Sequence, residues 1–247
     1  MRGKINLFLA LLLAATGALA REPDWSAYVR LLQAHVHPGT LQGVHLNRVD
    51  YSALRRDPDF TAAIATLEGF DPKQLSGRKE RLAFWINAYN LLAMKVVLDH
   101  WPVASIKEVG NFLFPVWKRD AGKVGGKAVT LDGIENEVLR PLGEPRVHMA
   151  IVCASIGCPD LRREPYTAAA LDGQLDDQAR AYLANPDKGL RLEAGVAHVS
   201  KIFDWFDQDF DKVGGVPAFL ARYAPHWPDP APRIEADIPY NWSLNGD

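Results

Sequence analysis

Apolar residues recur at helical spacing in several parts of the chain. Residues 25–36 and 171–183 each show this period and are predicted to form helices. Residues 52–67 predict another helix, with a break at Asp57-Pro58 because proline removes a backbone donor. Shorter helices are expected over 132–139, 202–210 and 216–223.

The strongest helical segment covers residues 76–100 and ends before Trp101-Pro102. Apolar residues occupy nearly every face of it, which is typical of a buried central helix. Asn87 and Asn90 interrupt this pattern and project from the same side. Buried amides need hydrogen-bond partners, so these two either hold loop backbone in place or contact a substrate.

The remaining apolar segments are short and predict strands. Residues 111–118 are expected to be extended, residues 128–130 and 238–242 to be short strands, and residues 190–199 to be a hairpin. Residues 146–153 are apolar on both faces and predict a central strand. Strands and helices do not alternate regularly, which favours a single α+β domain over residues 21–247. In it, the long buried helix packs on a small mixed or antiparallel sheet.

The first twenty residues have the pattern of a secretory signal. Arg2 and Lys4 precede a short apolar run, and Ala18-Leu19-Ala20 offers a cleavage site. The run is shorter than the ~20 residues that a membrane span needs, so we expect a periplasmic or secreted protein without a stable span after cleavage. The alternative is an uncleaved anchor helix. The formal net charge of −2 and the scattered basic residues argue against nucleic-acid binding.

The densest chemical signal is His148 followed by Cys153 and Cys158. A histidine that takes the proton of a nearby thiol makes it a better nucleophile. Strand alternation places His148 on the opposite face from Cys153, whereas Cys158 lies in the following loop. Cys158 is therefore the predicted nucleophile, with Glu135 as the group that orients the His148 ring.

Each of these residues also has an alternative interpretation. Cys153 and Cys158 can close a disulfide in an oxidising compartment, and His148 can be a core histidine. A zinc site on His148 and both cysteines lacks an obvious fourth ligand. Glu135 can instead belong to a capping box that starts at Asp132. We expect no metal and no cofactor.

Several ordered motifs between residues 50 and 245 resemble the domain of unknown function 547 family. They are Phe84-Trp-Ile-Asn-Ala-Tyr-Asn90, Thr130-Leu-Asp-Gly-Ile-Glu-Asn-Glu-Val-Leu-Arg140, Pro145-Arg-Val-His148, Cys153-Ala-Ser155, Cys158-Pro-Asp-Leu161, Ser200-Lys-Ile-Phe203, Trp205, Asp209-Phe210 and Tyr240-Asn-Trp-Ser-Leu-Asn245.

The resemblance implies an exported, bacterial-type domain with a fold similar to papain-like thiol hydrolases. It implies a catalytic group of Cys158, His148 and Glu135, surrounded by substrate-contacting residues: Asn87, Asn90, Cys153, Ser155 and Lys201. The family usually has Asp where this chain has Asn241, so any negative charge that the acid gives the site would be missing here.

Three functions compete at this stage. The first is a thiol-dependent hydrolase or acyl transferase that acts on amide, peptide or thioester bonds. The second is a binding module, without catalysis, for a small molecule, a peptide or a cell-envelope ligand, with Cys153 and Cys158 bridged. The third is a redox partner, which ranks last because the Cys153–Cys158 spacing is longer than the Cys-x-x-Cys of efficient thiol exchange.

Overall fold

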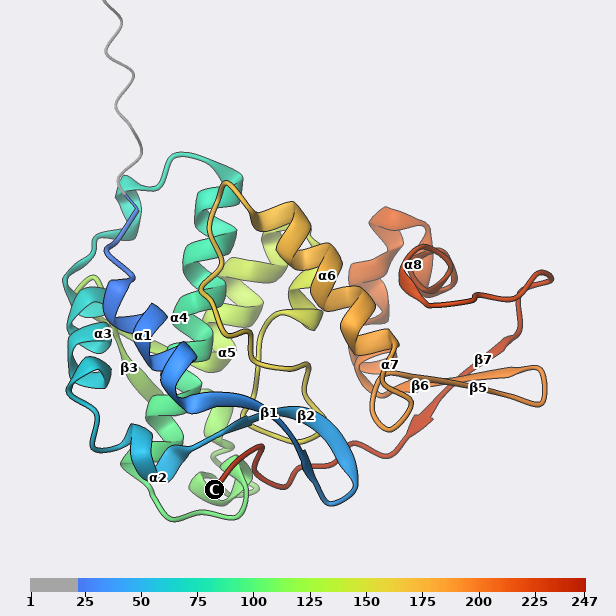
Figure 1. The fold of residues 1–247 in the computed structure, drawn as a ribbon. Helices are drawn as coiled ribbons and strands as arrows, with labels where there is room; N and C mark the ends of the chain where they lie inside the picture. The colour runs from blue at the N-terminus through green and yellow to red at the C-terminus, as the bar shows by residue number, and fades with distance from the viewer. Residues whose placement is uncertain (1–21) are drawn as a thin grey trace, which may run out of the picture.

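A computed structural model describes residues 22–247 of the chain. The predicted signal at residues 1–20 lies outside the described residues. The architecture is single-domain α+β, as the sequence predicts, and one long helix runs through its larger core (Figure 1). The likeness to papain-like folds stays a prediction.

That helix is α4 (Arg78–Asp99). It begins where the Glu80 carboxylate accepts hydrogen bonds from the backbone N–H groups of Ser76 and Gly77, both at 2.9 Å. It ends at His100, just before Pro102, a residue that cannot continue a helix. Fourteen of its residues are buried, so the prediction of a buried central helix is confirmed.

The other predicted helices are present. α1 (Ser26–His35), α2 (Tyr51–Leu54) and α3 (Pro58–Gly69) lie beside α4, and the expected break between α2 and α3 falls at Asp57. The Asp57 side chain caps α3 by accepting from the N–H of Asp59 at 2.9 Å. The later helices are α5 (Leu131–Gly133), α6 (Leu171–Leu183), α7 (Ile202–Trp205) and α8 (Gly215–Tyr223).

Three small sheets complete the described part of the chain. β1 (Val36–Leu41) and β2 (Val44–Val49) form a hairpin that the sequence analysis missed. β3 (Asp120–Val124) and β4 (Lys127–Thr130) form a hairpin beside α4, of which the sequence predicted only the short strand at residues 128–130. β5 (Leu190–Glu193) and β6 (Val196–Ser200) form another, and β7 (Arg233–Ile238) adds to β6 in parallel.

Three strand predictions are wrong. One is the strand at residues 238–242, since β7 ends at Ile238. Residues 146–153 form no strand; the segment opens with the 3-10 helix η6 (Pro145–Met149). Pro145 fits the first turn of a helix, and the Glu144 side chain accepts from the N–H of Arg146 at 3.3 Å. A short buried apolar run does not distinguish a strand from a helical turn. Residues 111–118 are also not one extended segment but a bend followed by the 3-10 helix η3 (Val116–Lys118).

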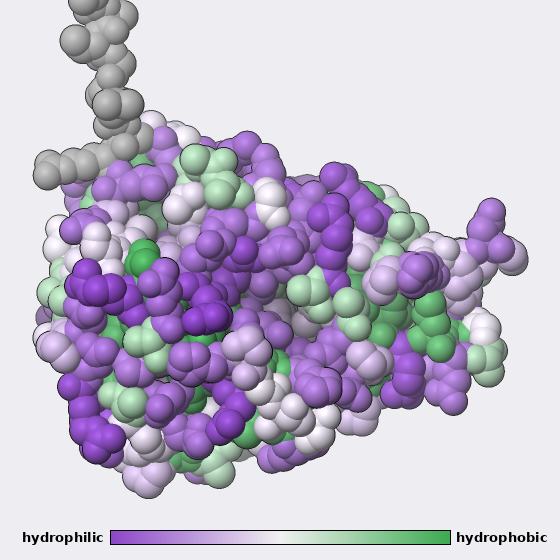
Figure 2. Space-filling model, in the orientation of Figure 1, coloured by the Kyte–Doolittle hydropathy of each residue, from purple (hydrophilic) through white to green (hydrophobic). Residues whose placement is uncertain are grey.

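The buried residues form two clusters, one around α4 and one under α6, α8 and the three-stranded sheet. Tyr240 packs against both, which places it at their junction. Among the described helices, α4 is long and apolar enough to cross a membrane, but most of it is buried in the core. Figure 2 shows one face covered mainly by hydrophilic side chains, with hydrophobic ones scattered between them.

Candidate functional site

The first wall of the candidate site is an irregular helix that follows β4. Thr130 caps its start by accepting from the N–H of Gly133 at 2.9 Å. Thr130, rather than Glu135, therefore performs the capping that the sequence left open for Glu135. α5 continues into a π-helical turn (Ile134–Leu139), in which the Arg140 N–H bonds the Glu135 carbonyl. π-turns of this kind are frequent at functional sites.

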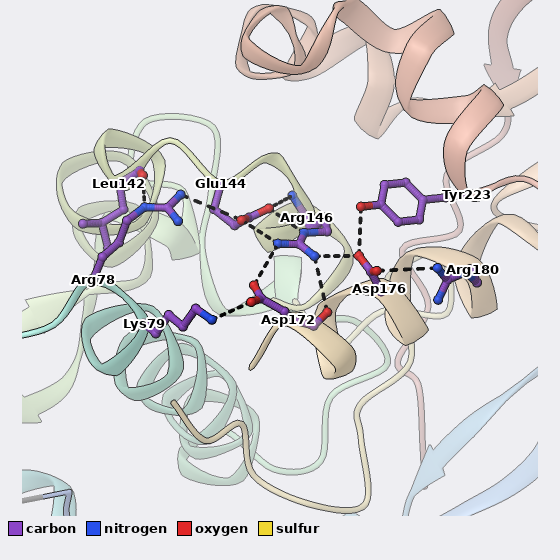
Figure 3. A network of polar contacts seen from close by, with 9 residues as sticks. All are labelled: Arg78, Lys79, Leu142, Glu144, Arg146, Asp172, Asp176, Arg180 and Tyr223. Atoms are coloured by element: carbon purple, nitrogen blue, oxygen red, sulfur yellow. Dashed lines mark hydrogen bonds and ion pairs between the residues drawn. The ribbon is translucent and has the colours of Figure 1, made fainter. Parts of the chain in front are cut away.

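The second wall is η6, which carries Arg146 and His148 into different surroundings. Arg146 enters a network of carboxylates shown in Figure 3. Its guanidinium donates to Glu144 at 2.7 and 2.8 Å and to Asp176 at 2.6 Å. His148 instead lies at the junction of the two cores, with its ring stacked on Phe206 at 4.1 Å between centroids.

His148 has one bonded ring nitrogen and one free one. Nε2 lies 2.7 Å from an oxygen of Asp209. Nδ1 is buried without a hydrogen-bond partner among residues 22–247. The nearest carboxylate oxygen on that side belongs to Glu135, at 3.9 Å, which is too long for a hydrogen bond. Glu135 therefore lies beside His148, as predicted, with a gap between the two groups.

Asp209 links His148 to a chain of polar side chains. Arg140 donates to both of its oxygens, at 2.6 and 3.1 Å, and to the Asn136 carbonyl oxygen at 2.7 Å. Asn136 in turn donates to Asp132 at 3.0 Å. These contacts hold Asp209 in place and pair its charge with that of Arg140.

Burial and pairing move the pKa values in this group apart. Burial raises the pKa of Glu135 to about 7, with Arg140 opposing the shift. Burial lowers the pKa of His148, although the bond to Asp209 acts against it. The hydrogen bond from His148, followed by those from Arg140, keeps the pKa of Asp209 well below its usual range. Near neutral pH, His148 is thus neutral, Asp209 is charged and Glu135 is close to its midpoint.

These groups line a cavity of about 250 Å³. Glu135, Asp132 and His148 lie on its wall, and most of the remaining surface is aromatic: Tyr89, Trp117, Trp205, Phe206, Tyr240 and Trp242. We call this cavity the aromatic pocket. A largely apolar cavity with a few converging polar groups and a shifted pKa is the usual form of a ligand-binding or catalytic site.

The two cysteines form a disulfide, one of the alternatives that the sequence left open. Cys158, the predicted nucleophile, is 1% exposed and is not part of the pocket wall. Cys153 does line the pocket, and the Tyr240 hydroxyl lies 3.2 Å from both sulfurs. The argument that favoured Cys158 depended on strand alternation from His148, and that strand does not exist. In the bridged state neither sulfur is a thiolate.

Residues 72–183 match the sequence profile of the family described as "Protein of unknown function, DUF547". The match supports the resemblance of this segment to that family, and it covers less than half of the chain. Searches of curated proteins and of solved structures found no match. The DUF547 segment contains Glu135, His148 and both cysteines, whereas Asp209 and Tyr240 lie C-terminal to it.

Asn87 and Asn90, two asparagines of the DUF547 segment, hold backbone and are not on the pocket wall. Asn87 donates to the carbonyl of Tyr166 at 2.8 Å and accepts from its N–H at 2.9 Å. Asn90 donates to Ala150 at 3.0 Å and accepts from Val152 at 2.8 Å. Their amide oxygens and nitrogens are thus satisfied by backbone, the first of the two roles weighed for them.

Three other singled-out residues also lie off the pocket wall. Ser155 is buried and donates to the Cys153 carbonyl at 3.3 Å. Lys201 precedes α7 and is partly exposed. Asn241 donates to Gln42 at 3.0 Å, so the position at which the family usually has Asp points away from the pocket.

Sequence reasoning missed Asp209 and the aromatic residues as parts of the site. Asp209 is 61 positions from His148, and no spacing rule joins them. The only signal was their presence among the motifs that resemble the family, in Trp205, Asp209-Phe210 and Tyr240.

A second group of metal-ligating side chains lies outside the pocket. His198, Glu235 and Asp237 bring their ligand atoms within 4.8 Å of one another on β6 and β7. His198 already bonds Asp237 at 2.9 Å, and Glu235 pairs with Arg233. These polar groups thus have protein partners, and we assign them no function.

Proposed function

We propose that this protein binds a small organic ligand in the aromatic pocket and that the Cys153–Cys158 disulfide is a fixed part of the pocket wall. The observation that carries the proposal is the pocket itself, an aromatic cavity with Glu135 and His148 on its wall and a bridged Cys153. A bridged cysteine cannot act as a thiolate nucleophile, whereas an aromatic wall binds apolar surface in either redox state.

Export is part of the same proposal. The N-terminal sequence pattern favours secretion, and disulfides persist in the periplasm or outside the cell. In such a compartment the bridge stays closed, so the binding state is the resting state of the protein.

The test uses the three pocket tryptophans, Trp117, Trp205 and Trp242, as reporters. A panel of small aromatic amines, alcohols and acids is added while the indole N–H signals are followed by NMR. We expect at least one compound to shift the pocket signals and to lose its binding in Trp205→Ala. Trp227→Ala, which changes a tryptophan of the second core, is the matched control. A panel that shifts no pocket signal would refute the proposal.

The second candidate is the thiol-dependent hydrolase or acyl transferase. It is favoured by one observation, that Cys153 lines the same pocket as His148 and Glu135. An external thiol would first reduce the bridge. Cys153 would then attack an acyl carbon while His148 takes the thiol proton. The amine or thiol leaving group would depart with that proton, and water or a second acceptor would take the acyl group from Cys153.

Alkylation separates the two candidates. Without reductant, we expect neither cysteine to react. After reduction, the hydrolase requires Cys153 to react with an apparent pKa below the ~8.5 of an ordinary thiol. It also requires that His148→Ala abolish this shift and that a thioester probe be cleaved by Cys158→Ala but not by Cys153→Ala. A normal thiol pKa and no cleavage would leave binding as the function.

A further inference from the structure

Apart from tyrosines, the ionisable side chains on the wall of the aromatic pocket are two carboxylates and one imidazole. They are Asp132, Glu135 and His148, and no lysine or arginine among residues 22–247 lines the cavity. Asp209 lies behind His148, and its charge is balanced by the two hydrogen bonds from Arg140. The cavity is therefore an environment that favours a positive charge.

The two carboxylates and the imidazole on this wall offer acceptors to the cavity. The Asp209 carboxylate can only accept, so His148 Nε2 carries the ring proton and donates it to Asp209. Nδ1 then offers a lone pair. It is buried in a side chain that is 1% exposed, and no described residue donates to it. A buried acceptor without a partner is costly, so this atom favours a ligand that carries a donor.

The spacing of the acceptors fits a single nitrogen with several protons. Nδ1 of His148 and Oε1 of Glu135 are 3.9 Å apart. A nitrogen at about 2.8 Å from each of them can donate to both, and an ammonium group has three donors. A quaternary ammonium has the charge but no N–H, and an alcohol has the donor but no charge.

The aromatic wall accounts for the rest of such a ligand. Trp205, Tyr240 and Trp242 contact one another, with ring centroids 4.6 to 5.8 Å apart. Aromatic rings of this kind bind apolar groups and attract cations. One cation already uses this surface, since Lys107 Nζ lies 4.7 Å from the Trp242 ring centroid.

We propose that the ligand of the aromatic pocket is a primary amine in its ammonium form, carried on an apolar or aromatic body. The ammonium donates to His148 Nδ1 and to the Glu135 carboxylate, and the body packs on Trp205 and Tyr240. This inference depends on the proposed binding function and narrows its ligand class.

Protonation of the pocket gives the proposal a second readout. The titratable and charged groups around Glu135 are Asp132, His148, Arg140, Asp209, Tyr89 and Tyr240. With a pKa of about 7, Glu135 must lose its proton to pair with the ammonium, and the proton passes to solvent. Burial lowers the pKa of His148 below its usual value and raises that of Tyr89 well above its own, so His148 is uncharged at neutral pH and above and Tyr89 keeps its proton.

The experiment compares four matched probes by calorimetry on the full chain without its signal. The probes are 2-phenylethylamine, 2-phenylethanol, phenethyltrimethylammonium and 3-phenylpropanoate. We expect the amine to bind at least tenfold more tightly than each of the others. Its affinity should rise from pH 6 to pH 8, with release of about half a proton per amine bound at pH 7.

Two variants locate the effect. Glu135→Gln should remove most of the tenfold preference and the proton release. Glu137→Gln, on the same π-helical turn but exposed and outside the aromatic pocket, should leave both unchanged. Circular dichroism of both variants establishes that they are folded.

The outcomes separate the two proposals. If the alcohol or the quaternary ammonium binds as well as the primary amine, the pocket binds small ligands but the ammonium assignment is wrong. If the amine keeps its preference in Glu135→Gln, the assignment to this wall is wrong. If none of the four probes binds at millimolar concentration, the inference is overturned and the binding function loses support with it.

Discussion

Arg146 and His148 stand two residues apart on one short 3-10 helix, yet their surroundings differ in kind. Arg146 is bonded on all three of its nitrogens, and carboxylates from its own segment and from α6 surround it (Figure 3). His148 is more deeply buried, but only one of its nitrogens has a partner. A closed network of this type fixes segments to one another, whereas a buried atom without a partner is a feature that folding alone does not favour.

The carboxylates around Arg146 and the Glu135 carboxylate in the aromatic pocket differ in the same way. Glu144, Asp172 and Asp176 face Arg146, Lys79 or Arg180, so pairing stabilises their charged forms. Glu135 faces an aromatic cavity, and burial raises its pKa. We infer that the Arg146 network holds the two cores together and that the pocket gives up some stability to keep its binding groups free.

The strongest test of this comparison removes the cation of the closed network. Arg146→Met should lower the free energy of unfolding by about 3 kcal/mol or more, because Glu144 and Asp176 lose their closest cation in a partly buried setting. Urea unfolding at pH 7 measures the loss. Arg180→Met, whose 59% exposed side chain pairs with Asp176 at 3.5 Å, should change it by less than about 0.5 kcal/mol. Equal effects of the two would show that the network is not the stabilising element.

Glu135→Gln should raise the free energy of unfolding, which is the opposite of the effect expected for Arg146→Met. The folded-state pKa of Glu135 is above its unfolded value, so the protein loses stability as the pH rises from about 4.5 through 7. Glutamine keeps the shape and removes the charge. At pH 8 the variant should be more stable than the parent by up to about 3 kcal/mol, a gain that nearly vanishes at pH 4.5.

Unfolding curves at the two pH values measure this gain, and Glu137→Gln is its control. A variant that is destabilised at pH 8 would place Glu135 with the closed network instead of the pocket. That result would also contradict the inference that the charged Glu135 carboxylate lowers the stability of the protein in order to bind a ligand.

The disulfide combines features of the Arg146 network and the aromatic pocket. It crosslinks the chain, and one of its cysteines, Cys153, lines the pocket. In Cys153→Ala/Cys158→Ala the free energy of unfolding should fall by about 2 kcal/mol, as expected for the entropy of so short a loop. Binding of the ligand found in the panel should persist in the folded variant. Loss of binding with unchanged stability would show that the sulfurs contact the ligand directly.

Most of the helices could be predicted from the sequence, because long amphipathic or fully apolar periods leave few alternatives. α4 is the clearest case, and even the backbone role of its asparagines was among the expectations. The β1–β2 hairpin was missed because its strands are partly exposed, irregular and contain Pro38 and Gly39. Its turn depends on Gln42 and Gly43 with positive φ, which the pattern of apolar residues does not reveal.

The site was predicted only where its residues are close in sequence. Glu135 and His148 lie beside each other, with 3.9 Å between Oε1 and Nδ1, although the supposed strand that carries His148 is a helical turn. Asp209 and Tyr240 come from distant segments whose approach is a result of tertiary packing, so spacing along the chain contains no sign of it. The choice of Cys158 over Cys153 used an alternation that exists only in strands, and the segment that carries His148 is a 3-10 helix.

The smallest expected effect concerns Asn241, where the family usually has Asp. In the structure its amide nitrogen donates to exposed Gln42 at 3.0 Å and its oxygen accepts from the Ser243 N–H at 3.0 Å. Asn241→Asp keeps the acceptor, and Gln42 can rotate its amide to donate instead. We therefore expect a change below about 0.5 kcal/mol in the free energy of unfolding and a ligand affinity within about twofold of the parent. A tenfold gain in amine affinity would instead mean that a negative charge at position 241 acts on the aromatic pocket, and that residue 241 belongs to the pocket wall.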